Sequence, residues 1–171
     1  ELTARPFHVL CEIAPIYVLG DFAADPAPSG FALQPARPIA LGDWRHQGLP
    51  FYPWAVRYQF PVSLAESAQR MAVEVPAWAG SVVYVRWNDR ACGSTALPPY
   101  RIEWCGTFAK GEHRLTMEVA GNLKNLLGPH FSDGLPGAWS WLYDPQPQPP
   151  GRDYRFYETG LLAAPRLWTS R

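Results

Sequence analysis

The sequence predicts an all-β fold in which layers of short strands bury their apolar faces against each other. Three observations carry this prediction. Several segments alternate apolar and polar residues with a period of two, turn-forming residues separate them at short intervals, and no stretch keeps a helical period over three turns. Nineteen prolines among 171 residues also favour short strands over long helices. A β-sandwich or a barrel follows.

The clearest strands lie between residues 55 and 120. Three segments place their apolar residues on one face: Val56, Tyr58, Phe60 and Val62 in residues 55–62; Met71, Val73 and Val75 in residues 70–75; Leu115, Met117 and Val119 in residues 114–119. Residues 81–87, SVVYVRW, are apolar on both sides for most of their length. That pattern predicts a central strand covered on both faces.

Four further segments read as strands: residues 16–22, 30–34, 101–104 and 155–162. Residues 63–69, SLAESAQ, suit one turn of helix or a loop. The polar pair Asn88–Asp89 follows the 81–87 strand. Asn and Asp side chains hydrogen-bond nearby backbone groups and tolerate unusual dihedral angles, so we expect a hairpin-type turn between two core strands.

Residues 121–154 break this rhythm. The segment is rich in Gly and Pro and too long for a simple connection, and such loops are often functional. Its end, PQPQPPG, is expected to be extended. Nothing else in the sequence divides the chain, so we expect residues 1–171 to form a single β-sandwich domain that carries this long aromatic and proline-rich loop.

Composition narrows the classes of partner. Basic and acidic residues balance at fifteen each, which argues against nucleic acid or an anionic membrane. No apolar run approaches the ~20 residues of a membrane span. The chain begins at Glu1 with no signal-like segment, so we expect a piece of a longer protein whose localisation the sequence leaves open.

The three cysteines, Cys11, Cys92 and Cys105, form no CxxC pair; Cys92 and Cys105 are either free thiols or paired across neighbouring strands.

Four motifs follow one another in residues 54–120: Tyr58 and Phe60; Val83, Val85, Trp87, Asn88 and Asp89; Pro99 and Tyr100; Gly111, His113, Leu115, Met117 and Val119. In this order they resemble the sugar-binding-like jelly-roll domain of glycoside hydrolase family 2, of the galactose-binding-like fold. Two positions depart from the family pattern, since Trp87 replaces a valine and Asp89 replaces a glycine. The flanks IYVLGDF and NLLGPHF are similar to segments of large bacterial proteins related to α-L-rhamnosidases.

The resemblance implies a two-sheet jelly roll that serves as a non-catalytic accessory domain of a bacterial glycoside hydrolase. In such a parent the catalytic residues lie elsewhere, and the expected partners are carbohydrate, the catalytic domain, or both. It also leaves open that Asn88 faces a sugar at the sandwich edge. Domains of this fold often hold one structural calcium ion, for which Asp21, Asp25 and Glu158 are weak candidates; no other cofactor is expected.

Catalytic chemistry finds little support in the sequence. Glycoside hydrolysis needs two carboxylates ~5–10 Å apart, and no context marks any of the available ones: Asp43, Asp89, Glu103, Asp133 and Glu158. Ser140 lacks the glycines of a nucleophile elbow. The histidines show no metal-binding spacing, and His130 in the long loop is the one that remains a candidate for ligand contact.

Aromatic residues are the stronger functional signal, because sugar rings stack their C–H faces on Trp and Tyr. Residues 43–54, DWRHQGLPFYPW, and 137–143, GAWSWLY, concentrate aromatics beside polar side chains. The candidate ligand-binding residues are therefore Trp44, Arg45, His46, Trp54, Asn88, Asp89, His130, Trp139 and Trp141. For the tryptophans the alternative is packing or domain docking, and Trp78, Trp87 and Trp104 are expected in the core. The second functional hypothesis is a purely structural interaction module without sugar affinity.

Overall fold

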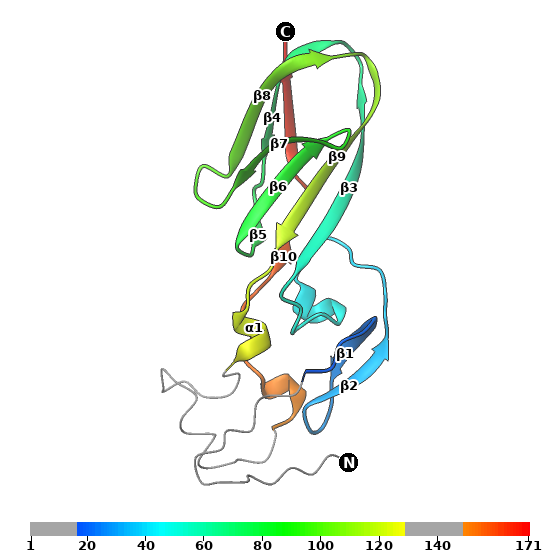
Figure 1. The fold of residues 1–171 in the computed structure, drawn as a ribbon, viewed down its shortest axis with the longest axis vertical. Helices are drawn as coiled ribbons and strands as arrows, with labels where there is room; N and C mark the ends of the chain where they lie inside the picture. The colour runs from blue at the N-terminus through cyan, green and yellow to red at the C-terminus, as the bar shows by residue number, and fades with distance from the viewer. Residues whose placement is uncertain (1–16, 129–148) are drawn as a thin grey trace.

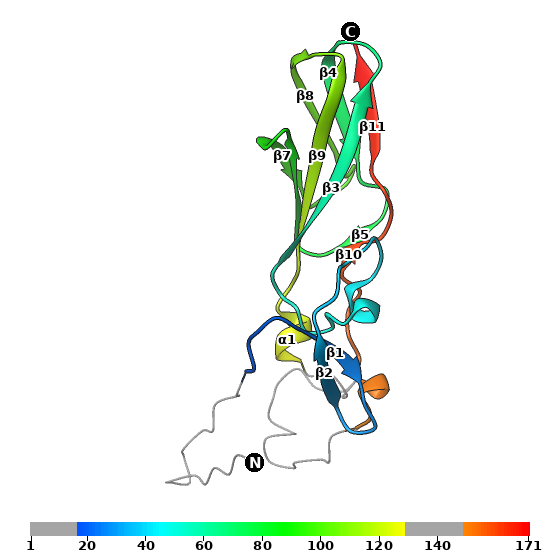
Figure 2. The same ribbon diagram turned by 90° about the vertical axis from the view of Figure 1, so that its right-hand side faces the viewer.

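The computed structural model describes residues 17–128 and 149–171, and the fold it shows is all-β. One antiparallel sheet has the order β3 (Ala55–Leu64), β9 (Gly111–Ala120), β6 (Val82–Trp87), β7 (Arg90–Thr95). The other has the order β11 (Arg166–Ser170), β4 (Ala68–Glu74), β8 (Arg101–Phe108). Figure 2 shows these two sheets as the facing layers of a sandwich. The predicted fold class is confirmed.

The strand connections are those of a jelly roll. Apart from the β6–β7 hairpin, each strand of the two large sheets is followed by one in the opposite sheet, from β3 to β4, then to β6, and from β7 through β8 and β9 to β11. Residues 65–67 turn the chain from β3 to β4, so the segment 63–69 consists of this turn and the two strand ends beside it and contains no helix. Such alternation lets neighbouring segments of sequence bury their apolar faces against each other.

The core lies between the sheets, where the period-two pattern placed it. Val83, Val85, Met117 and Val119 are buried from the four-stranded sheet, and Val73 faces them from β4. Trp87 is buried with them, while Trp78 and Trp104 pack against the cluster from partly exposed positions. These three tryptophans are core residues, as the sequence predicts.

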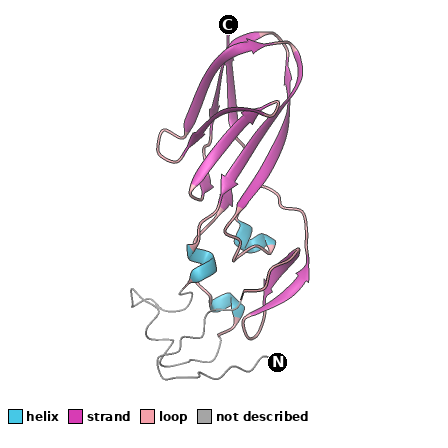
Figure 3. Cartoon of the chain, in the orientation of Figure 1, coloured by secondary structure: helices cyan, strands magenta, loops and turns pink. Residues whose placement is uncertain are grey.

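At one end of the sandwich lies a smaller lobe, formed by N-terminal and C-terminal segments of the described chain and by the segment that follows β9 (Figure 1). It contains the hairpin of β1 (Phe22–Pro26) and β2 (Phe31–Pro35), the 3₁₀ helices η1 (Trp44–Gln47) and η2 (Gly151–Asp153), and the one-turn helix α1 (Lys124–Leu127). Figure 3 shows the helical turns gathered on this side of the molecule. Sequence reasoning placed no separate lobe there.

A two-strand pair joins the sandwich to the lobe. Strand β10 (Gly160–Leu161) pairs with β5 (Trp78–Ala79). The same backbone reaches the lobe, because Leu161 O accepts from Gly42 N and Thr159 O accepts from Trp44 N, both at 2.8 Å. The lobe is therefore hydrogen-bonded to the chain that leads into β11.

Three predictions of local structure are wrong in part. Strand β6 is central in its sheet, but only one of its faces is covered, since Tyr84 is 46% exposed and Arg86 is also exposed. In residues 155–162 only β10 is a strand, because the preceding residues use their polar groups in the lobe. In residues 16–22 the described part is extended only from Phe22 onward. Most of the predicted loop 121–154 lies outside the described residues, and its two ends form α1 and η2.

Candidate functional site

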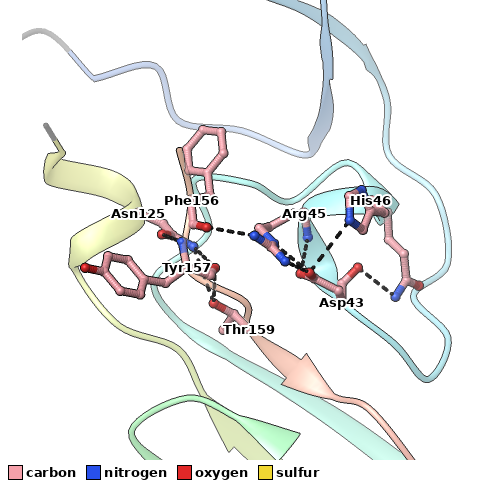
Figure 4. Close-up of polar contacts among 8 residues, drawn as sticks. Asp43, Arg45, His46, Asn125, Phe156, Tyr157 and Thr159 are labelled. Atoms are coloured by element: carbon pink, nitrogen blue, oxygen red, sulfur yellow. Dashed lines mark hydrogen bonds and ion pairs between the residues drawn. The ribbon is translucent and has the colours of Figure 1, made fainter. Parts of the chain in front are cut away.

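Polar contacts of the lobe gather around η1, the centre of the sequence-predicted ligand segment (Figure 4). Asp43 caps the N-terminus of η1 by accepting from Arg45 N at 3.0 Å. The Arg45 side chain donates to Asp43 Oδ2 at 2.5 Å and to Phe156 O at 2.7 Å. Arg45 thus connects η1 to the segment before β10, more than a hundred residues later in the sequence.

These contacts keep Asp43 charged to a lower pH than an ordinary aspartate, because they lower its pKa. Burial alone raises the pKa of its carboxyl, but the hydrogen bonds from the Arg45 side chain and backbone outweigh this effect and lower the pKa below its usual value. His46 Nε2 lies 3.8 Å from Asp43 Oδ2, and its side chain is 80% exposed. The carboxylate therefore serves as a helix cap and an arginine anchor, while the imidazole faces solvent.

A second set of contacts fastens α1 to the same segment (Figure 4). Asn125 is buried, and its amide bonds the Tyr157 backbone in both directions: Nδ2 donates to Tyr157 O at 2.7 Å and Oδ1 accepts from Tyr157 N at 2.8 Å. Asn125 Nδ2 also lies 3.4 Å from Thr159 Oγ1. The Asn125 side chain therefore makes with Tyr157 the two backbone hydrogen bonds that a residue of a neighbouring strand would make. The sequence did not indicate this role.

The two described candidate tryptophans have opposite environments. Trp44 is 0% exposed, and its Nε1 donates to Tyr58 Oη at 2.7 Å inside the main core. The prediction that Trp44 faces a ligand is therefore wrong, because the ring has no accessible surface. Trp54 is 71% exposed just before β3. Of the two, only Trp54 offers an aromatic surface to a partner.

Asn88 and Asp89 form the predicted hairpin turn. Both have positive φ, 46° and 68°, as a two-residue type I′ turn requires, and the flanking residues Trp87 and Arg90 pair across it. Asn88 Oδ1 accepts from Arg114 N at 2.9 Å, and its Nδ2 lies 2.9 Å from His113 Nδ1. The turn thus hydrogen-bonds the start of β9 through the Asn88 amide, which the sequence offered as a sugar contact, and Asn88 is exposed.

Three other carboxylates raised by the sequence pair with arginines. Asp89 pairs with Arg114, and Glu103 lies 2.6 Å from Arg101 Nε. Asp25 uses both carboxylate oxygens on Arg37, whose guanidinium lowers the Asp25 pKa through a side-chain hydrogen bond. A calcium ion at Asp25 would therefore have to displace that guanidinium.

Within the described ranges, no three His, Cys, Asp or Glu residues are grouped as potential metal ligands. Asp21 and Glu158 are exposed. Cys92 and Cys105 are free thiols.

His130, Trp139 and Trp141 lie outside the described residues, as does Asp133. In the same described part, no helix combines the length and the apolar character that a bilayer crossing requires.

Sequence reasoning missed an aromatic cluster in the lobe. Phe31 of β2 contacts Phe51 edge-to-face at 4.8 Å and Tyr154 at 5.1 Å, and Phe51 contacts Phe156 at 5.0 Å. Such arrangements of rings are favourable beyond the area they bury, and partial burial raises the Tyr154 pKa. Both segments that form the cluster are rich in aromatic residues, and this was the available signal in the sequence. The segments lie about a hundred residues apart, and the period-two pattern of strands does not predict that they meet.

Comparison with known proteins adds one likeness. No known protein family and no curated protein matches the chain. A crystal structure of a GH2 β-galacturonidase from Eisenbergiella tayi, bound to glycerol, aligns with 85% of this chain at 16% sequence identity and a TM-score of 0.45. The aligned region covers 22% of that enzyme chain, so this chain spans about a fifth of its length.

Proposed function

We propose that the chain is a non-catalytic accessory domain of a bacterial glycoside hydrolase related to α-L-rhamnosidases. In this proposal the lobe docks on the catalytic domain of the parent enzyme and helps to shape its substrate cleft. The sandwich acts as the rigid support. The order of motifs over residues 54–120 and the two-sheet fold support the glycosidase relationship.

The observation that carries the docking proposal is the distribution of exposed apolar side chains. Most of the large ones in the described residues belong to segments of the lobe or to its junction with β3: Tyr17, Val18, Leu19, Leu33, Leu41, Trp54, Leu123, Leu127 and Tyr157. Exposed apolar surface concentrated in one region is typical of protein interaction sites. Interfaces between domains of one chain use surfaces of this kind.

The polar contacts favour docking over sugar recognition at the residues that the sequence selected. Trp44 is buried, and Arg45 and Asn88 are engaged in hydrogen bonds within the chain. His46 and Trp54 keep their exposed surface and remain available for weak sugar contact. The same observation supports the second candidate function, a purely structural interaction module, in which the lobe only holds neighbouring domains together.

The test uses the glycoside hydrolase that contains this domain. Leu123→Ser with Leu127→Ser removes two apolar side chains from the lobe, and each buried leucine contributes about 1.5–3 kcal/mol to an interface. We expect the catalytic domain, supplied as a separate chain, to bind the double variant at least tenfold more weakly, with a raised KM in the reconstituted enzyme. The control is Leu97→Ser, at an exposed leucine outside the lobe (77% exposed, against 59% for Leu123 and 54% for Leu127).

Three outcomes separate the candidates. Weaker binding with an unchanged KM supports the purely structural module over the role in shaping the cleft. Equal binding by wild type, the double variant and the control contradicts docking through the lobe. Glycosidase activity of the isolated chain, lost on removal of a carboxylate, contradicts the non-catalytic role.

A further inference from the structure

We propose that the outer face of the three-stranded sheet, on the opposite side from the core, binds a saccharide that carries a carboxylate. The proposal goes beyond docking and involves none of the lobe residues. Its centre is Trp168 on β11, a residue that the sequence patterns did not mark. Trp168 is 51% exposed, although tryptophan is usually buried in proteins of this size.

The strand register places Trp168 on the solvent side of the sheet. Leu167 pairs with Val73, which is fully buried in the core, so the next residue along β11 points the other way. Trp168 itself pairs with Ala72 of β4. Ala72 has a small side chain that is only 5% exposed, whereas half of the Trp168 surface reaches solvent.

Charged groups border the indole on one side. The row beside it is Arg166, Glu74 and Arg101, one residue from each of the three strands, and Glu103 lies in the same row as Trp168. Arg166 Nη1 approaches Glu74 Oε1 at 3.4 Å. Sugar hydroxyls donate hydrogen bonds to carboxylates and accept them from guanidinium groups, and both kinds of group lie beside the indole on this face.

The row on the other side provides a cation with no counterion. Arg70 pairs in the sheet with Ser170 and Cys105. It forms no ion pair within the part of the chain that the structure describes, in contrast to Arg101 and Arg166 on the same face. Two residues along a strand span roughly 7 Å, so a sugar stacked on Trp168 brings its substituents within reach of the Arg70 guanidinium. This is the group that binds carboxylates most effectively.

An open groove continues the face beyond Arg70. This shallow groove has a volume of about 540 Å³ and is lined by Ser67, Ala68, Gln69, Cys105, Gly106, Thr107 and Arg171. The lining provides hydroxyl and amide groups next to small apolar side chains, and its one guanidinium, that of Arg171, is ion-paired with Glu66. Sugar-binding sites combine such a hollow with a few convergent polar groups. An indole platform, an unpaired arginine and a groove thus lie in sequence along one sheet.

The test follows the indole N–H signals of the ¹⁵N-labelled chain during saccharide titration. Eight tryptophans give separate signals, and the Trp168→Phe variant assigns the one from Trp168. The probes are trimers of glucuronic, galacturonic and mannuronic acid, each with its neutral counterpart in which the carboxylates are reduced to hydroxymethyl groups. We expect at least one acidic trimer to shift the Trp168 signal, and its neutral counterpart to bind about tenfold more weakly.

Variants supply the second measurement. Trp168→Ala weakens binding of the acidic trimer about tenfold, and Arg70→Ala weakens the acidic trimer while leaving the neutral one unchanged. Tyr84→Ala is the matched control, because Tyr84 has similar exposure on the outer face of the other sheet. Backbone amide spectra verify that each variant is folded.

Several results would overturn the assignment. They are a shift of another indole without that of Trp168, equal affinity for acidic and neutral trimers, equal losses in Trp168→Ala and Tyr84→Ala, and no response to any probe. None of these results affects docking through the lobe, which is measured with the catalytic domain. Conversely, failure of lobe docking leaves the saccharide titration unchanged.

Discussion

At the scale of single residues, Trp44 and Tyr58 form a buried hydrogen bond between side chains of the core. Trp44 Nε1 donates to Tyr58 Oη at 2.7 Å, and Leu161 N approaches the same hydroxyl at 3.5 Å. The Tyr58→Phe variant leaves the indole N–H buried without an acceptor. Such a loss costs about 1–3 kcal/mol.

We therefore expect Tyr58→Phe to lower the free energy of unfolding by that amount, measured by urea denaturation. The control is Tyr84→Phe, which removes an exposed hydroxyl and should change stability by less than about 0.5 kcal/mol. Equal effects of the two variants would show that the buried hydrogen bond contributes nothing beyond a surface hydroxyl.

The Asp43 carboxyl makes the stability of the fold depend on pH. Its folded pKa is lowered, so the folded state holds its carboxylate more tightly in the charged form than the unfolded state does. The resulting stability is fully present above the unfolded pKa of about 3.9, and it is lost as the pH falls through the lower folded pKa.

The Asp43→Asn variant should therefore be less stable than wild type near neutral pH, with a difference that shrinks as the pH falls below about 4. Denaturation curves between about pH 2 and 7 measure this. Asp21→Asn, which removes an exposed carboxylate, serves as the control. A difference that is constant over the whole range would show that Asp43 acts only through its shape.

At the scale of elements, the β6–β7 hairpin depends on the left-handed conformation of its two turn residues. Asp89 has a φ of 68°, a region that glycine adopts freely and β-branched residues avoid. Both Asp89→Gly and Asp89→Val remove the exposed ion pair with Arg114. The difference between the two variants therefore isolates the backbone conformation.

We expect Asp89→Val to be about 1–3 kcal/mol less stable than Asp89→Gly, with Asp89→Gly close to wild type. Thermal and urea unfolding of the three proteins provide the comparison. If valine and glycine were equivalent at this position, the turn would not hold its positive φ in solution.

Strands with one buried face were readable from the sequence, and the elements of the lobe were not. The predicted segments 55–62 and 114–119 pair along their whole length in the structure, since alternation records burial directly. Strand β11 escaped detection because Trp168 sits at a position where alternation predicts a polar residue. Strand β6 was assigned two covered faces because Tyr84 counts as apolar, although it is half exposed.

The candidate site shows the same limit. The turn at Asn88–Asp89 follows from local chemistry and was predicted correctly. Whether Trp44 points into the core depends on Tyr58 and Leu161, which lie 14 and more than a hundred residues away in the sequence. Clusters of aromatic residues indicate that rings are close together, but the fold alone decides which of them reach solvent.

At the scale of the whole molecule, the lobe and the sandwich share one core. Trp44 belongs to the lobe helix η1, yet it packs in the same buried cluster as Leu161 and the strand residues of both sheets. Gly160 permits this approach: a Cβ there would meet Gly42 O and lie 2.9 Å from the Trp44 ring. Because the two parts bury the same side chains, we expect them to unfold together.

The Gly160→Ala variant should therefore lower the stability of the lobe and the sandwich by the same amount, about 2 kcal/mol or more. Hydrogen exchange at amides of β2 and β9 reports on the two parts separately. Gly111→Ala is the matched control, because Gly111 has a similar φ, 131° against 139°, with no atom within 4 Å of the added methyl group. Loss of protection in β2 with β9 unaffected would mean that the lobe opens on its own, and a docking surface built on it would then form only in contact with its partner.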